Sequence, residues 1–283
     1  MAPSGYPRPD ALLGRGTVSA RLLMHPALLL GGPRAILMQV AHPKVAAGVA
    51  DHSQFASDPF GRLVRTMRTM DRIAFGSAAR SARALEGLAA RHRRVNGTTG
   101  AGEHYSALDP ALTLWVHATL VDTALTVDRR YLGLLGRADR DRFYEESLLL
   151  AAAFRIPDDL VPPDLPSFRA YVDEMAATVE VGRDARSIAR HVLRPPLSGR
   201  AGGALGLLAA PILEAVTADL LPGRLRREYR LRRAPSLVPG RALPGPIGAA
   251  TDGAGAVGMG LAAAVSRLVA PRVSGLPVSR LAL

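Results

Sequence analysis

Residues 109–132, DPALTLWVHATLVDTALTVDRRYL, give the strongest indication of the fold. Asp109 followed by Pro110 is typical of a helix start, because the Asp side chain caps the first turn and proline fits the first helical position. The following residues are apolar on nearly every side, which is typical of a helix at the centre of a fold. We expect this helix to reach Leu132, to stop at Gly133 and to carry one histidine, His117.

Apolar residues recur at helical spacing in most other segments, and alternating strand patterns are scarce. Pro43 is expected to kink or divide a helix over 33–50, and Ser77 is expected to cap a helix over 78–95. These patterns predict an all-α protein with a single globular domain of about ten helices. The other predicted helical segments are 11–30, 59–75, 138–153, 167–180, 183–193, 203–220 and 223–233.

The predicted helical domain covers residues 1–235, and a second region covers 236–283. That second region begins with many glycines and prolines, so we expect a C-terminal extension with one short helix at about 256–269. Hydrophobic residues make up 48% of the chain, enough to bury a sizeable core.

The chain contains no cysteine, which excludes disulfides, thiolate metal sites and cysteine nucleophiles. A metal or haem iron would need His, Asp, Glu, Tyr or Met as its protein ligand. Seven histidines are available: His25, His42, His52, His92, His104, His117 and His191.

The formal net charge of +12 is carried almost entirely by arginine, since Lys44 is the only lysine. We interpret the arginines as spread along the chain and expect no nucleic-acid partner. The sequence has no pattern typical of a secretory signal and no apolar run long enough for a span, which favours the cytoplasm. The apolar segment 201–221 leaves peripheral membrane contact open.

His92 falls on the apolar face of the predicted helix 78–95, together with Leu85 and Leu88. It is either a core histidine satisfied by a hydrogen bond or an axial ligand of a haem iron. On the helix 59–75, Arg62 and Thr66 share one face. Arg62 can pair with a carboxylate of a neighbouring helix or of a ligand such as a haem propionate, and Arg65 can reach a cavity mouth.

His117 also has two interpretations. We first expect a structural hydrogen bond to another helix, and the alternative places His117 beside a cofactor or substrate. His42 precedes Pro43 and can satisfy carbonyls that the proline frees. Asp51, His52 and Gln54 form a polar cluster expected to edge a pocket. The sequence has no nucleophile elbow, phosphate-binding loop or zinc-protease motif.

Five segments in order resemble one family, which includes bacterial latex-clearing rubber oxygenases and the fungal mycophenolic-acid-pathway oxygenase MpaB. The resemblance covers roughly residues 15–235. Its segments are PRAILMQVAHPKVAAGVADHSQFASDPFGRLVRTMRTMDRIAFG (33–76), RHRRVNG (91–97), HYSALDPALTLWVHATLVDTAL (104–125), FYEESLLLAAAFRIPDDLVPPDLPSFRAYVDEM (143–175) and LPGRLRREYRL (221–231).

The resemblance implies that the helices enclose a pocket for haem b, an iron cofactor, and that the chain is an oxygenase. His92 matches the family's proximal iron ligand, and Arg62 with Thr66 matches an Arg-x-x-x-Thr pair that lines the haem pocket. His117 lies in a family-typical motif and is counted with the cofactor-binding candidates. Arg65 and Thr66 are the candidate catalytic residues, which would hold dioxygen beside the haem.

Arg65 stands where rubber oxygenases have a distal lysine, and no glutamate upstream of Arg62 matches the base proposed for rubber cleavage. Asp51 or Asp58 are the available substitutes. An arginine stays protonated and is a very poor iron ligand, so we do not expect rubber cleavage. The leading hypothesis is a haem-b oxygenase that takes a small apolar organic substrate and dioxygen. The alternatives are a non-catalytic haem or apolar-ligand carrier and a cofactor-free scaffold that binds nucleic acid or anionic membrane.

Overall fold

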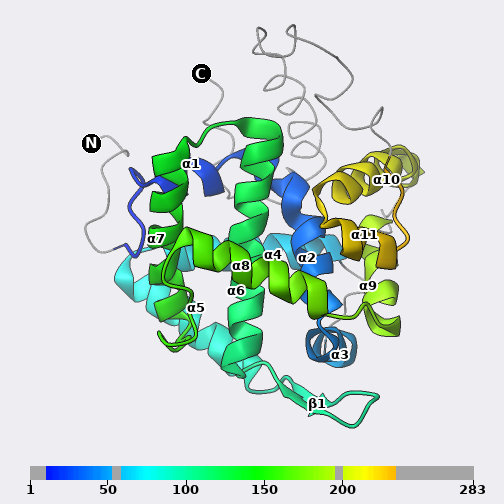
Figure 1. Cartoon of the computed structure of the whole chain (residues 1–283), viewed down its shortest axis with the longest axis horizontal. Helices are drawn as coiled ribbons and strands as arrows, with labels where there is room; N and C mark the ends of the chain where they lie inside the picture. Colours follow the sequence, from blue (N-terminus) through cyan, green and yellow to red (C-terminus); the bar gives the residue numbers. More distant parts are fainter. Residues whose placement is uncertain (1–10, 53–58, 195–199, 234–283) are drawn as a thin grey trace, which may run out of the picture.

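Helix α6 (Pro110–Val127) stands at the centre of the computed structural model, with the other helices packed around it (Figure 1). The structure describes residues 11–52, 59–194 and 200–233. Asp109 caps α6 as predicted, because its Oδ1 accepts the N–H groups of Ala111 at 2.8 Å and Leu112 at 3.4 Å. Trp115 in α6 is fully buried, as expected for a helix that is apolar on every side.

Eleven α-helices make up most of the described structure, and its one sheet has only two short strands, so the predicted all-α fold is confirmed. Short segments of 3₁₀-helix (η1, Pro26–Gly31) and π-helix (η2, Asp128–Leu132) join some of them. The remaining α-helices are α1 (Val18–Leu23), α2 (Gly32–Ala41), α3 (Pro43–His52), α4 (Pro59–Phe75), α5 (Ala78–His92), α7 (Arg137–Ala153), α8 (Leu165–Thr178), α9 (Arg183–Leu193), α10 (Arg200–Leu220) and α11 (Gly223–Glu228).

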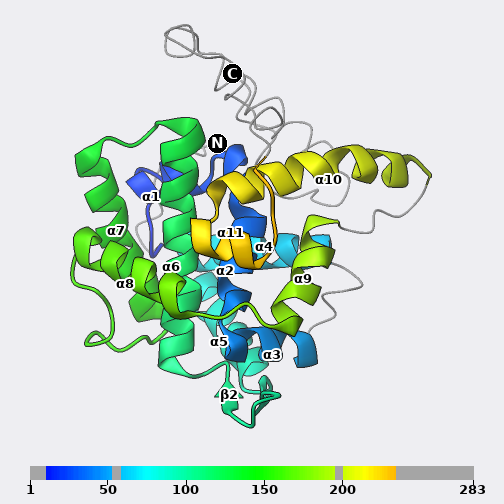
Figure 2. The ribbon, with the colours of Figure 1, turned by 45° about the vertical axis from the view of Figure 1, so that its right-hand side comes forward.

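One main core joins α6 to the surrounding helices. Trp115 of α6, Leu37 of α2, Phe168 of α8 and Ile188 of α9 belong to the same buried cluster. In Figure 2, α7 and α8 lie on one side of α6, while α2, α9 and α11 lie on the other. Helices α4 and α5 belong to a smaller cluster, which includes Ile73 and reaches α7 at Leu150.

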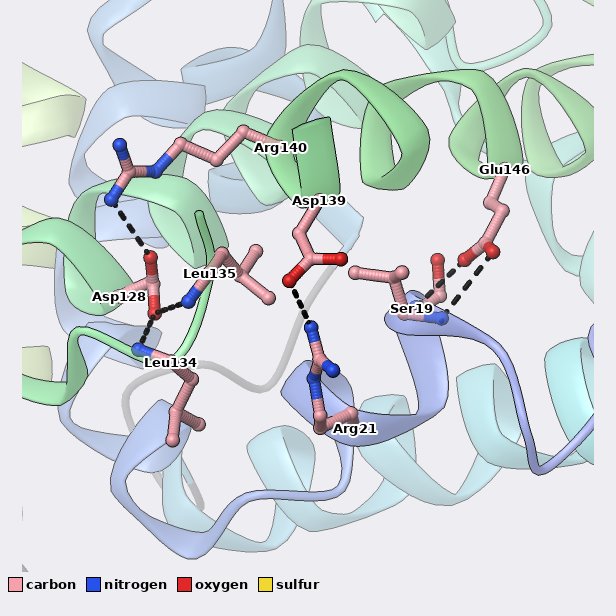
Figure 3. A network of polar contacts seen from close by, with 9 residues as sticks. Ser19, Arg21, Asp128, Leu134, Leu135, Asp139, Arg140 and Glu146 are labelled. Carbon is pink, nitrogen blue, oxygen red and sulfur yellow. Dashed lines mark hydrogen bonds and ion pairs between the residues drawn. The ribbon is translucent and has the colours of Figure 1, made fainter. Parts of the chain in front are cut away.

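Buried polar groups fix the positions of α1 and α2. Glu146 of α7 accepts the backbone N–H of Ser19 at 2.7 Å, and so caps the start of α1 (Figure 3). Arg34 of α2 is 3% exposed and donates to Asp122 Oδ2 at 2.5 Å and to Thr123 Oγ1 at 2.5 Å, both on α6. Its Nε also donates to the Leu220 carbonyl oxygen at 2.9 Å, which ties α10 to the same pair.

The end of the central helix follows the prediction closely. The helical chain continues to Leu132 through the π-helical segment η2, and Gly133 adopts the left-handed region at φ 64°. Asp128 Oδ1 accepts the backbone N–H groups of Leu134 at 2.8 Å and Leu135 at 3.2 Å (Figure 3). The side chain of Asp128 therefore shapes the turn into α7.

Several predicted boundaries need correction. The helix predicted over 78–95 ends at His92, and an antiparallel hairpin that the sequence did not predict follows it. Its strands are β1 (Asn96–Thr98) and β2 (His104–Ser106), which protrude at one end of α6 (Figure 1). We expected Pro43 either to kink or to divide the helix predicted over 33–50. The structure shows that it divides the helix into α2 and α3. The short helix predicted at 256–269 lies outside the described residues.

Candidate functional site

The inward face of α5 carries the first candidate. Leu85 and Leu88 are half-buried and pack with the cluster that includes Ile73 of α4 and Leu150 of α7. His92 follows Leu88 by four residues, so it continues the same row by one turn. The His92 side chain is half-buried in the last turn of α5. The position fits a histidine at the border of an apolar interior.

The hairpin directly after α5 holds the end of that helix against α3. Tyr105 of β2 is 2% exposed, and its hydroxyl donates to Asp51 Oδ2 at 2.6 Å. Burial, followed by the bond to Asp51, raises the pKa of Tyr105 to about 12, so the phenol stays protonated. The His52 ring lies 3.0 Å from the Asn96 carbonyl oxygen through Nε2.

This arrangement gives two members of the polar cluster a structural role, and that the cluster edges a pocket stays a prediction. Asp51 and His52 contact Tyr105 and Asn96 of the hairpin, and Gln54 lies outside the described residues. His92 is only four residues before the strand that His52 contacts. The polar cluster therefore contributes to the site indirectly, by fixing the backbone beyond His92.

Helix α4 carries the candidates Arg62, Arg65 and Thr66. The side chains of Arg65 and Thr66 are exposed, while the side chain of Arg62 and the whole of Asp58 lie outside what the structure describes. Two residues, Gly76 and Ser77, join α4 to α5, and Ser81 Oγ donates to the Ile73 carbonyl oxygen at 2.9 Å across the connection. The two helices that carry the pocket candidates are therefore direct neighbours.

His117 is almost completely buried in α6, with 5% of its surface exposed. Burial lowers the pKa of His117 to about 4, so the ring is neutral at physiological pH. The predicted hydrogen bond to another helix is not formed among the described residues. Instead, the ring stands edge-on to Phe154, with the two centroids 6.3 Å apart. A buried imidazole without such a bond is uncommon, because buried polar groups usually find partners.

Phe154 links His117 to the other candidates. Besides contacting His117, Phe154 packs in the cluster that contains Ile73 of α4 and Leu85 and Leu88 of α5. The sequence spacing could not show this connection, because it depends on where α7 ends. The structure thus brings α4, α5 and the His117 face of α6 to one apolar interior.

The other histidines have local structural roles or are exposed. His42 Nδ1 accepts the backbone N–H of Lys44 at 3.3 Å, so the prediction that it satisfies carbonyls is wrong. His25 Nδ1 accepts the N–H of Ala27 at 3.2 Å and caps η1. His191 Nδ1 lies 2.9 Å from the Ser187 carbonyl oxygen, and His104 is exposed. Within the described residues, no group of three or more His, Asp or Glu can hold a metal ion.

One small hollow lies between α6, α7 and α8, with a volume of about 120 Å³. Its lining is charged, but much of that charge is paired within the protein. Asp122 binds Arg34 at 2.5 Å, and Arg140 lies 3.5 Å from Asp128 in an ion pair (Figure 3). These contacts hold the helices together, which gives this hollow a structural role.

The arginines are spread along the chain, but they are denser in one segment. Residues 59–95, which cover α4 and α5, contain nine arginines and only two acidic residues, Asp71 and Glu86. This short segment therefore carries +7 of the chain's net charge of +12. No helix within the described residues is long and apolar enough to cross a membrane.

The described residues form an all-helical domain. Residues 20–245 match the family described as ER-bound oxygenase mpaB/B'/Rubber oxygenase, catalytic domain, and the chain belongs to this family. Two uncharacterized proteins, from Mycobacterium bovis and Mycobacterium tuberculosis, are each 28% identical over 225 residues. The alignment covers 73% of this chain and 88% of each relative. No solved structure gives a significant match.

Proposed function

We propose that this chain is a haem-b-dependent oxygenase that acts on a small apolar organic substrate. The observation that carries the proposal is the position of His92. It belongs to the RHRRVNG segment of a chain in an oxygenase family, and it continues the half-buried Leu85–Leu88 row of α5. An imidazole at the edge of an apolar interior is the usual proximal ligand of a haem iron.

The donor set fits haem better than a metal ion held by protein alone. A protein-only centre needs several side-chain ligands, and no such group exists among the described residues. Haem needs one strong axial ligand from the protein, because the porphyrin supplies the equatorial ligands. The neutral ring of His117 and the Phe154 ring support an apolar lining that accepts a macrocycle or a substrate.

Each candidate then has a distinct role. His92 would hold the haem through its iron, and Arg62 with Thr66 would orient the haem propionates. Arg65 keeps its positive charge and donates hydrogen bonds to dioxygen or a polar substrate group. The His117 ring lines the pocket as a neutral group, because burial lowers its pKa to about 4. When bound, haem supplies the activation of dioxygen, and the protein supplies binding, orientation and exclusion of water.

The difference at Arg65 supports a substrate other than rubber. Lysine can lose its proton and bind iron, whereas arginine cannot do so in a protein. The segment from 33 to 61 also contains no glutamate, only Asp51 and Asp58. Asp51 accepts the Tyr105 hydroxyl at 2.6 Å, so it is already engaged. We therefore assign no residue of this segment as a catalytic base.

The experiment is a comparison of three proteins produced in haem-supplemented cells. Wild-type protein and His104→Ala, which removes an exposed histidine, should show a strong Soret band that shifts on reduction and on adding carbon monoxide. His92→Ala should lose most of that band at unchanged protein yield. Full haem occupancy in His92→Ala would overturn the ligand assignment. Dioxygen consumption with a reductant and apolar test substrates then separates an oxygenase from a haem carrier.

A further inference from the structure

A second hollow lies at the connection between α4 and α5 and has a volume of about 510 Å³. Its described lining consists of Arg72 from the last turn of α4, Arg80 and Arg83 from the first turns of α5, and Ala84. The size is typical of pockets that hold small molecules. Both hollows are lined by three arginines, but the small hollow beside Arg140 also has two carboxylates, and the described lining of this one has none.

The three arginines are exposed, and none forms an ion pair within the described residues. The acidic residues of the same segment are Asp71 on α4 and Glu86 on α5, and neither is among the described residues that line the hollow. Burial raises the pKa of Asp71, whereas the charges of Arg15 and Arg72 lower it. The hollow is therefore strongly positive, and it lies on the segment that carries most of the chain's net charge.

The start of α5 adds to this field. Ser77 is the N-cap residue, but its side chain accepts no hydrogen bond from the helix, contrary to the predicted cap. The positive end of the helix dipole therefore lies within the first turn of α5, close to Arg80, which lines the hollow. Guanidinium groups next to a helix N-terminus favour phosphate or carboxylate oxygens.

Ala84 connects this positive hollow to the apolar interior. It lines the hollow and also packs with the cluster that contains Leu85, Leu88 and Phe154. Along α5, the row then continues to His92. With a rise of about 1.5 Å per residue, Arg80 and Arg83 lie roughly 14–18 Å from His92 along the helix axis. This face of α5 is therefore charged at the end near Arg80 and Arg83 and apolar toward His92.

We propose that the Arg72–Arg80–Arg83 hollow binds the anionic headgroup, phosphate or carboxylate, of an amphipathic substrate whose apolar chain extends along α5 toward His92. This inference rests on the proposed function, because it places the substrate chain at the haem site. Nucleic acid fits less well, since residues 59–95 contain only Phe60 and Phe75 as aromatic residues for base stacking. Among the side chains that the structure describes, the large exposed hydrophobic residues, Leu108, Leu134, Leu149 and Leu160, lie outside α4 and α5, which favours a soluble anion over membrane insertion.

The test compares dodecyl phosphate, dodecanol and inorganic phosphate by isothermal titration calorimetry on the full chain, with and without haemin. Wild-type protein should bind dodecyl phosphate at least ten-fold more tightly than dodecanol. The double variant Arg80→Gln/Arg83→Gln should lose that preference and keep its affinity for dodecanol. The control Arg169→Gln changes an exposed arginine of the small hollow and should bind like wild type. Unfolding temperatures of both variants check that the fold is retained.

Three outcomes would overturn the inference. The first is equal affinity for the phosphate and the alcohol, and the second is an unchanged preference in the double variant. The third outcome combines two results: wild type does not bind soluble dodecyl phosphate, and the double variant loses binding to phosphatidylglycerol vesicles. The arginines would then be a membrane contact. The haem spectrum separates the two proposals. A wild-type protein that prefers dodecyl phosphate but binds no haem keeps this site and loses the oxygenase function.

Discussion

Helix α6 and the α4–α5 pair are built on opposite principles. In α6, the single charged side chain, Asp122, is partly buried and paired with Arg34 at 2.5 Å, and Trp115 is completely covered. In α4 and α5, most charged groups are exposed arginines, and the inward row of Leu85, Leu88 and His92 is only half-buried. The difference fits a structural role for α6 and the ligand-binding role that we propose for α4 and α5. Substitutions in the two regions should therefore affect different properties.

The largest expected effect on stability is at Arg34. Replacing it in Arg34→Ala removes three hydrogen bonds and leaves Asp122 and Thr123 without their partner in the interior. Breaking a buried ion pair in this way costs about 3–5 kcal/mol of unfolding free energy. Thermal denaturation should show a decrease of roughly 10 °C in Tm. The matched variant on α5, Arg83→Ala, should unfold at the wild-type temperature. Equal losses would remove the contrast between the regions.

The next effect concerns the pH dependence of stability through His117. Its pKa is lowered from 6.5 to about 4 in the folded protein, so the unfolded chain binds a proton more readily. Stability from this group is complete above pH 6.5 and is lost as the pH falls toward 4. The loss amounts to about 3 kcal/mol. His117→Leu should flatten the urea-unfolding free energy between these pH values relative to wild type. Parallel pH profiles for both proteins would contradict a buried, neutral imidazole.

Two glycines give a smaller, matched comparison of packing. A Cβ at Gly31 would lie 2.6 Å from Thr123 Cγ2 and 2.9 Å from Val127 Cγ2, both on α6. Gly31→Ala should therefore cost about 1–3 kcal/mol. A Cβ at Gly87 in α5 would meet only a guanidinium nitrogen of Arg91, at 3.8 Å. Gly87→Ala should be neutral or stabilise by up to about 1 kcal/mol, because alanine favours a helix. Chemical denaturation of both variants measures the change in unfolding free energy. A loss of stability in Gly87→Ala as large as in Gly31→Ala would show that α5 is packed as tightly as α6.

The smallest expected effect is at the hairpin that follows α5. Tyr105→Phe keeps the ring but removes the hydroxyl that donates to Asp51 at 2.6 Å. A hydrogen bond to a charged group contributes about 1.5–3 kcal/mol at most, and this one is only partly buried, so we expect about 1 kcal/mol. Hydrogen exchange should increase in β1 and β2 and in the last turn of α5, but not in α6. Unchanged exchange around His92 would mean that the hairpin does not position that residue.

The sequence predicted α6 well because its signals are local. Asp109-Pro110 marks the start, an all-round apolar run marks the burial, and Gly133 with φ 64° marks the end. The hairpin was missed because each strand has only three residues and Asn96-Gly97-Thr98 has no alternating pattern. Its stability comes from Tyr105 packing near Gly48 of α3, a long-range contact.

The site was only partly predictable for the same reason. Family motifs and helical spacing identified His92, Arg62, Arg65 and Thr66, but gave no relation between them and Phe154. The arginine hollow depends on the two-residue turn at Gly76 and Ser77, which brings the last turn of α4 beside the first turns of α5. The roles of Asp51 and His52 likewise depend on a hairpin that the sequence did not reveal.

The most direct test of this account is hydrogen exchange of the wild-type chain with and without bound haemin. If α4 and α5 form the cofactor site around His92, haemin should protect amides in Pro59–Phe75 and Ala78–His92 from exchange. Amides in Pro110–Val127 should change little, because α6 is already buried in the core. Protection that appears in α9 or α11 and leaves α4 and α5 unchanged would contradict the assignment of the site.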